Sequence, residues 1–249
     1  MKSVRTDLDG GILRVTLARP EHRNAFDAGV IEQLHDAVRD AGDARVVWLS
    51  GEGPSFSAGA DADWMRSSVS LSREENVADA ERLRAMLTVL DECPAPTLAT
   101  VQGHAMGGGA GLVACCDIVV AQPDAVFAFS ETKLGLVPAV ISPFVIAKIG
   151  ASAARRLFVT GERFDAELAL RIGLATELAG DLEAAATRVI HEILSGGPHA
   201  TRVAKTIVRQ RPSGIETSRL IAEVRSGREA QEGLQAFLEK RPADWRDDR

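Results

Sequence analysis

Two short runs of small residues are the part of this chain best suited to do chemistry. Residues 57–60 read Ser-Ala-Gly-Ala after a strand-like run, and residues 107–109 are three glycines between a β-branched run and an apolar helical stretch. Small side chains leave the N–H groups of Ala60 and Gly108 open to a ligand, and a helix N-terminus favours an anion. Two such donors stabilise charge on an acyl oxygen by roughly 3 kcal/mol each. The two runs together predict a two-amide oxyanion site, as enolate chemistry on an acyl thioester requires.

Three glycines alone are equally consistent with an ordinary strand-to-helix turn. Further motifs, however, occur in a fixed order along almost the whole chain, at residues 19–26, 59–61, 103–118, 127–138, 160–174 and 236–241. In that order they resemble the crotonase (enoyl-CoA hydratase/isomerase) superfamily, and most closely its methylglutaconyl-CoA-type hydratases. The resemblance implies an α/β fold, a crotonase-like superhelix of ββα units with a helical C-terminal portion.

Glu131 is the candidate for proton transfer beside a thioester carbonyl, which needs a positioned acid or base. It follows a short apolar, strand-like run that starts at Phe127. The resemblance implies that Glu131 is the catalytic carboxylate. Apolar surroundings would raise the pKa of Glu131 and let it carry a proton near neutral pH. The competing interpretation is an exposed glutamate that pairs with Lys133.

The chain departs from the family pattern at Gly111, where hydratases of this superfamily commonly carry a second glutamate. Two carboxylates can hold a water for hydration, whereas one is enough to move a proton between carbons. The stretch 129–143 nevertheless resembles the hydratase branch. We therefore predict an enoyl-CoA hydratase-type lyase that adds water to, or removes it from, a 2-enoyl-CoA with Glu131 as acid/base. The alternatives are a Δ3,Δ2-enoyl-CoA isomerase that uses Glu131 alone and a non-catalytic acyl-CoA-binding protein. A Clp-like serine protease is disfavoured because the chain has no G-x-S-x-G motif.

The resemblance also implies the residues that bind the substrate and its CoA: Arg23, Ala25, Ala58, Asp61, Ala62, Trp64, Pro138, Phe237 and Lys240. Arg23 and Lys240 would meet CoA phosphates, although both are also consistent with solvated surface charges. Trp64 and Met65 would line the acyl pocket or serve as hydrophobic anchors. CoA is part of the substrate, so we expect no separate cofactor. We expect no metal either, because the three cysteines lack metal-ligand spacing.

Length and composition set the remaining expectations. The chain has 249 residues, 45% of them hydrophobic, and a net charge of −6, which disfavours nucleic acid as a partner. No apolar run reaches the roughly 18 residues of a spanning helix, and residues 1–7 lack the apolar stretch of a signal peptide, so we expect a cytoplasmic protein without a membrane partner. We expect a spiral core with the active site over residues 1–190 and a helical region for oligomerisation and CoA covering over 191–249. The resemblance implies a homotrimer or homohexamer.

Hydrophobic periodicity predicts the elements that position these residues. Asp27 is a predicted N-cap. Residues 61–73 lack periodicity and predict a mobile cover over the acyl site. The chain is predicted to be helical throughout from residue 142. The other predicted elements are a hairpin at 4–8 and 12–17, helices at 28–40, 74–90 and 110–115, and strands at 46–50, 96–102, 118–121 and 126–129.

Overall fold

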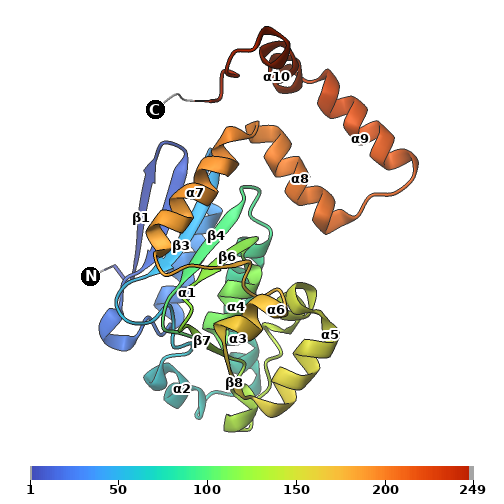
Figure 1. The fold of residues 1–249 in the computed structure, drawn as a ribbon. Helices are drawn as coiled ribbons and strands as arrows, with labels where there is room; N and C mark the ends of the chain where they lie inside the picture. The colour runs from blue at the N-terminus through green and yellow to red at the C-terminus, as the bar shows by residue number, and fades with distance from the viewer. Residues whose placement is uncertain (1, 247–249) are drawn as a thin grey trace.

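A six-stranded sheet lies at the centre of the protein, whose computed structural model describes residues 2–246. The strand order is β1-β2-β3-β4-β6-β9, with β1 and β2 antiparallel and the other neighbours parallel (Figure 1). The strands are β1 (Val4–Asp9), β2 (Ile12–Leu17), β3 (Val46–Gly51), β4 (Thr97–Val101), β6 (Ile118–Ala121) and β9 (Glu177–Leu178). The predicted hairpin and the predicted strands near residues 46, 97 and 118 are confirmed.

Helices cover both faces of this sheet because its central strands are apolar on both sides. In β3, Val46 and Trp48 face α7 (Leu182–Ser195), whereas Val47 and Leu49 face the main core. This alternation is the period-two geometry of a strand. On the core side lie α1 (Ala28–Arg39), α3 (Arg73–Asp91) and α4 (Gly108–Cys115). Asp27 caps α1 by accepting a hydrogen bond from the Val30 amide, as predicted.

A second, three-stranded sheet contains β5 (His104–Met106), β7 (Val126–Ala128) and β8 (Arg163–Asp165). Two isolated bridges extend it: Ser57 pairs with Ala105, and Phe26 pairs with Ala60. Ala105 pairs in turn with Phe127. Successive turns of the chain therefore place Ser57, Ala105 and Phe127 in one row across this sheet.

The structure differs from the sequence prediction at residues 62–68 and in parts of the region after residue 142. Residues 62–68 form helix α2 (Ala62–Ser68) instead of an aperiodic cover, because the Asp61 carboxylate caps it by accepting from the Asp63 amide at 2.9 Å. Helix α5 (Ser142–Thr160) begins where the helical region is predicted to begin, but it is interrupted at Gly150, whose φ is +76°. Two short strands, β8 and β9, also interrupt the region expected to be all helical, which includes α6 (Ala166–Arg171).

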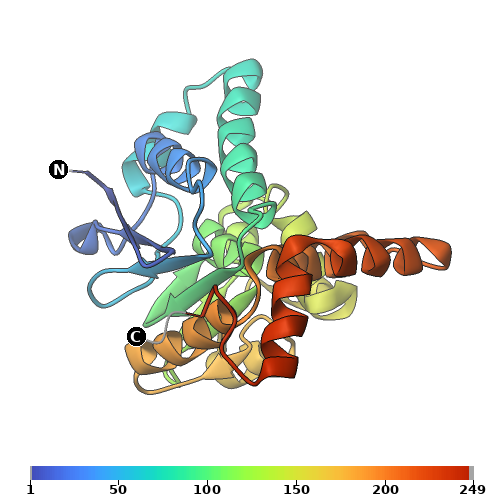
Figure 2. The same ribbon diagram turned by 90° about the horizontal axis from the view of Figure 1, so that it is seen from above.

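The last three helices leave the core as an arm. They are α8 (Pro198–Gln210), α9 (Ile215–Ser226) and α10 (Arg228–Glu239), and α9 extends away from the sheets in both views (Figures 1 and 2). Helices α8 and α9 bury no residue, and α10 buries only Ala236. The domain division predicted at residue 190 falls inside α7, whose buried residues pack on the sheet. Within residues 2–246, no helix combines the length and apolar character needed to cross a membrane.

Candidate active site

The candidate catalytic residues lie together because each follows the same row of the small sheet. Ala60 comes three residues after Ser57, Gly108 three residues after Ala105, and Glu131 four residues after Phe127. The row is held by backbone hydrogen bonds, from the Ser57 amide to His104 O at 2.9 Å and from the Met106 amide to Ser57 O at 3.0 Å. Pairing of consecutive turns of the spiral therefore brings the three positions to one end of the sheet.

Glycine allows the two loops to approach each other. A Cβ on Gly59, whose φ is +83°, would lie 2.6 Å from Met106 O and 3.7 Å from the Gly108 nitrogen. A Cβ on Gly108 would lie 2.8 Å from the ring of Phe26. Phe26 is buried and donates its own amide to Gly59 O at 2.9 Å. The loops therefore close over the Phe26 ring only if both positions lack a side chain.

The amides of Ala60 and Gly108 are available to a ligand. Within residues 2–246, neither N–H has a hydrogen-bond acceptor, and both residues line the same cavity. Gly108 is the first residue of α4, where N–H groups are unpaired and the helix dipole is positive. The arrangement can accept negative charge on a bound oxygen.

Glu131 lies beside these amides in apolar surroundings. Its Oε1 would be 3.4 Å from a Cβ on Gly107, so the carboxyl group lies over the backbone at the start of α4. Its Oε2 is buried and has no hydrogen-bond partner in the described part of the chain. Burial raises the pKa of Glu131 because the charged carboxylate loses its water. The competing interpretation, an exposed Glu131 paired with Lys133, does not fit, because this pair is not among the ion pairs that the structure describes for residues 2–246 and Oε2 is buried.

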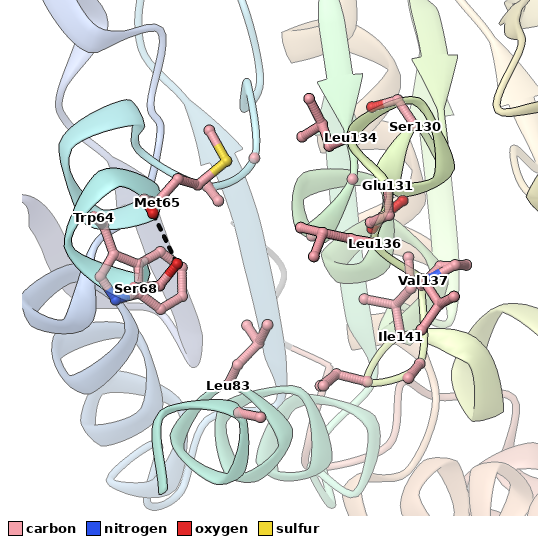
Figure 3. Close-up of a pocket in the computed structure, with 18 of the residues that line it drawn as sticks. Trp64, Met65, Ser68, Leu83, Ser130, Glu131, Leu134, Leu136, Val137 and Ile141 are labelled. Carbon is pink, nitrogen blue, oxygen red and sulfur yellow. Dashed lines mark hydrogen bonds between the residues drawn. The ribbon is translucent and has the colours of Figure 1, made fainter. Parts of the chain in front are cut away.

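The cavity around Glu131 has a volume of about 350 Å³ and lies between two walls (Figure 3). Trp64, Met65 and Ser68 of α2 form one wall, and the segment from Glu131 to Ile141 forms the other, with Leu83 of α3 between them. The lining contains two carboxyl groups, those of Glu131 and Asp79, and no lysine, arginine or histidine. The cavity suits a neutral, mainly apolar group.

Ile141 occupies the space beside Gly111. A Cβ on Gly111 would lie 2.5 Å from the Ile141 Cγ2 and 3.8 Å from the Leu87 Cδ2, and Ile141 itself is buried. A second carboxylate therefore has no room at position 111.

The structure brings together only part of the predicted binding set. Ala58, Ala60, Trp64, Gly108, Glu131 and Pro138 line the cavity, whereas Arg23, Ala25, Asp61 and Ala62 do not. Asp61 instead caps α2 and lies 3.6 Å from the Arg19 guanidinium. Phe237 and Lys240 belong to α10 and the residue that ends it, at the far side of the molecule from α2 (Figure 1).

Other cavity residues were missed by the sequence interpretation. They are the aliphatic and aromatic side chains Phe26, Leu134, Leu136, Val137 and Ile141, together with the polar Asn76 and Asp79. Leu83 was predicted on the apolar face of its helix, but not in the cavity. Asn76, Asp79, Ala80 and Leu83 recur at helical spacing in α3, a signal that could have identified a stripe facing the pocket.

Comparison with known proteins gives the family. The model of the enoyl-CoA hydratase/isomerase family matches residues 7–248. The chain belongs to the enoyl-CoA hydratase/isomerase family. It is therefore an enzyme whose class of substrate is CoA thioesters. The predicted crotonase fold is confirmed by the solved structures that it resembles.

Several relatives match this protein over nearly the whole length of both chains. Cyclohexa-1,5-dienecarbonyl-CoA hydratase of Thauera aromatica is 34% identical and covers 95% of this chain and 93% of its own. An enoyl-CoA hydratase structure from Shewanella pealeana is 39% identical, with a TM-score of 0.94 over 98% of this chain and 96% of its own. One from Mycobacterium smegmatis is 30% identical, with a TM-score of 0.90 over 98% and 99% of the two chains. The likeness to methylglutaconyl-CoA-type hydratases stays a prediction.

Proposed function

We propose that this protein hydrates a 2-enoyl-CoA, or dehydrates the product, with Glu131 as acid and base and the amides of Ala60 and Gly108 as the oxyanion site. The observation that carries the proposal is that Glu131, whose buried Oε2 has no partner among the described residues, lines one cavity with two unpaired N–H groups. The relatives described above are named hydratases, which supports hydration rather than isomerisation as the type of reaction.

The steps follow from this geometry. The Glu131 carboxylate takes a proton from water as the water oxygen bonds to C3 of the substrate. The electron pair of the C2=C3 bond moves to the thioester oxygen, where the amides of Ala60 and Gly108 stabilise the enolate. The Glu131 carboxylic acid then returns the proton to C2 as the thioester carbonyl re-forms. The raised pKa of Glu131 suits one group to both steps, because its protonated form is accessible closer to neutral pH. No separate cofactor enters these steps.

Isomerisation of a 3-enoyl-CoA to the 2-enoyl-CoA is the second candidate. Ile141 fills the space beside Gly111, so no carboxylate at position 111 holds the attacking water, and Glu131 alone can move a proton from C2 to C4. Both candidates use the same residues and differ in the substrate they convert.

Absorbance of the conjugated thioester separates the two reactions. We expect crotonyl-CoA to lose this absorbance through hydration, whereas gain of it from a 3-enoyl-CoA would indicate isomerisation. Glu131→Gln should lower kcat by about 10²–10⁴-fold with little change in thioester affinity, because it removes proton transfer at nearly constant volume. The control is Glu81→Gln, an exposed carboxylate of α3 that pairs with Arg84. Undiminished turnover in Glu131→Gln, or CoA binding without conversion of either thioester by the wild type, would contradict the proposal.

We further propose a homotrimer or homohexamer in which a second copy covers the arm. Val208 of α8, Phe237 and Leu238 of α10 are 76%, 79% and 78% exposed in the single chain, which is unusual for large apolar side chains gathered on one arm. Contact with a neighbouring copy would bury them and could bring Phe237 and Lys240 to the neighbour's CoA. The cytoplasmic location also stays a prediction.

A further inference from the structure

The last turn of α5 contacts the chain on both sides of Glu131. On the N-terminal side, the rings of Phe129 and Phe158 meet edge to face, with centroids 5.3 Å apart and planes at 87°. On the C-terminal side, the Thr132 hydroxyl donates a hydrogen bond to the Phe158 carbonyl at 3.1 Å. A single residue of α5, Phe158, therefore contacts both Phe129 and Thr132, which lie on either side of Glu131.

The contact of Thr132 with α5 has a clear structural cause. Phe158 lies among the last four residues of its helix, whose carbonyls have no helical N–H to accept from. Gly161, the residue that ends α5, lets Thr132 come close to the helix. A Cβ on Gly161 would lie only 2.7 Å from the Thr132 Oγ1, and its φ of +55° also favours glycine. The Thr132 hydroxyl thus pairs a helix-end carbonyl that would otherwise lack a partner in this half-buried position.

Glu131 depends on this turn because Oε2 of its carboxyl group has no hydrogen-bond partner among the described residues, and the hydrogen bond that the group makes is to its own backbone, within the same turn. The residue begins the 3-10 helix η2 (Glu131–Leu134), whose backbone is closed by the Leu136 amide donating to Glu131 O at 3.1 Å and the Lys133 amide donating to Ser130 O at 3.0 Å. Among the described residues, Thr132 gives the one side-chain hydrogen bond that joins η2 to another element. The direction of the Glu131 side chain is therefore set through its backbone.

We propose that Thr132 is a positioning residue for the reaction: its hydrogen bond to the Phe158 carbonyl fixes the turn that aims the Glu131 carboxyl at the substrate carbons. This inference rests on the proposed role of Glu131 as acid and base. Thr132 does not line the cavity, so it acts through Glu131 and not on the substrate.

The test compares two substitutions at the same position. Thr132→Val keeps the shape of the side chain and removes the hydroxyl, and it should lower kcat about 10- to 100-fold while KM changes less than about twofold, since small misplacements of a catalytic group have effects of this size. Thr132→Ser keeps the hydroxyl and should restore most of kcat. Loosening the turn also admits water, so the acidic limb of the kcat/KM profile of Thr132→Val should move to lower pH.

Thr206→Val is the matched control, because Thr206 likewise donates to a helix carbonyl, Arg202 O at 3.0 Å, but on the exposed arm. Its kcat and pH profile should equal those of the wild type. Wild-type kcat in Thr132→Val, or a loss that Thr132→Ser does not restore, would overturn the inference. Glu131→Gln distinguishes failure of the Thr132 role from failure of the proposed function. If Glu131→Gln is inactive while Thr132→Val is normal, only the role of Thr132 fails. An active Glu131→Gln would contradict the proposed function itself.

Discussion

Glu131 shows how one residue obtains unusual properties from its neighbours. Burial removes water from its carboxyl group, and a hydrogen bond to its own backbone offsets only part of that loss, so the neutral form is favoured and the pKa rises. A residue kept in this state costs folding stability at the pH where it is charged. Such a cost is typical of groups held ready for proton transfer.

The pH dependence of stability tests this at residue scale. Because the folded pKa of Glu131 lies above the value of about 4.3 in the unfolded chain, the folded state binds the proton more tightly, and its contribution to stability falls as pH rises through these two values. Glu131→Gln removes the buried charge, so it should unfold at a higher temperature than the wild type at pH 8, and the difference should shrink below about pH 4. Thermal unfolding between pH 3.5 and 8 measures this. A variant that is less stable than the wild type at pH 8 would contradict the argument.

Helix α4 illustrates the element scale, because its function depends on how closely it packs. Seven of its eight residues are buried, and glycines at 109 and 111 let it contact Ser57 and Ile141 directly. At its C-terminal end the Lys148 ammonium donates to Cys116 O at 2.7 Å and to Asp117 O at 3.0 Å. The helix dipole favours a cation at this end. The N-terminus with Gly108 is thereby held by packing along the whole helix.

Gly111→Ala tests the packing of α4 against α5. The added Cβ would lie 2.5 Å from the Ile141 Cγ2, and overpacking of this kind costs about 1–3 kcal/mol in the free energy of unfolding. Urea unfolding should show this loss, and the double variant with Ile141→Ala should be less destabilised than the sum of the single variants. Gly180→Ala is the control, since a Cβ there meets nothing within 4 Å. Additive effects of Gly111→Ala and Ile141→Ala would show that the two side chains do not compete for the same space.

At the scale of the whole molecule, the arm is joined to the core mainly by polar contacts. Lys205 of α8 lies 2.7 Å from the Asp117 carboxylate, and Arg209 lies 2.7 Å from that of Asp91. Arg45 of the core donates to Leu194 O at 2.8 Å, next to the start of the arm. These contacts fix one side of the arm and leave its apolar side chains exposed, which is the arrangement expected if another copy packs there.

The assembly can be tested through the exposed apolar residues of α10. Leu238→Asp should shift the mass measured by sedimentation from that of a trimer or hexamer toward that of a single chain, because it places a charge in the contact. Leu8→Asp on β1, where the leucine is 56% exposed, is the control and should leave the mass unchanged. Wild-type protein that sediments as a single chain at micromolar concentration would refute the proposed assembly.

Regular elements with strong local signals could be predicted from the sequence. The Asp27 cap, the strand at Val46 and the long helix that ends near Leu90 each have a periodic apolar pattern or a capping side chain, and they occur as predicted. Helix α2 was missed because it is short, buries no residue and depends on the Asp61 cap rather than on periodicity. The strands β8 and β9 were missed because two or three residues carry too little pattern to be recognised.

The order of motifs along the sequence determined the family, the fold class and the three central candidates, Glu131, Ala60 and Gly108, because each motif is a local feature of residue type and spacing. Only the tertiary structure decided that Ile141 fills the space beside Gly111 and that Phe158 holds the turn of Glu131. These contacts join residues 26 to 30 positions apart, through the packing of α5 against α4 and the chain around η2. Such contacts depend on how whole elements meet in space, which no local pattern specifies.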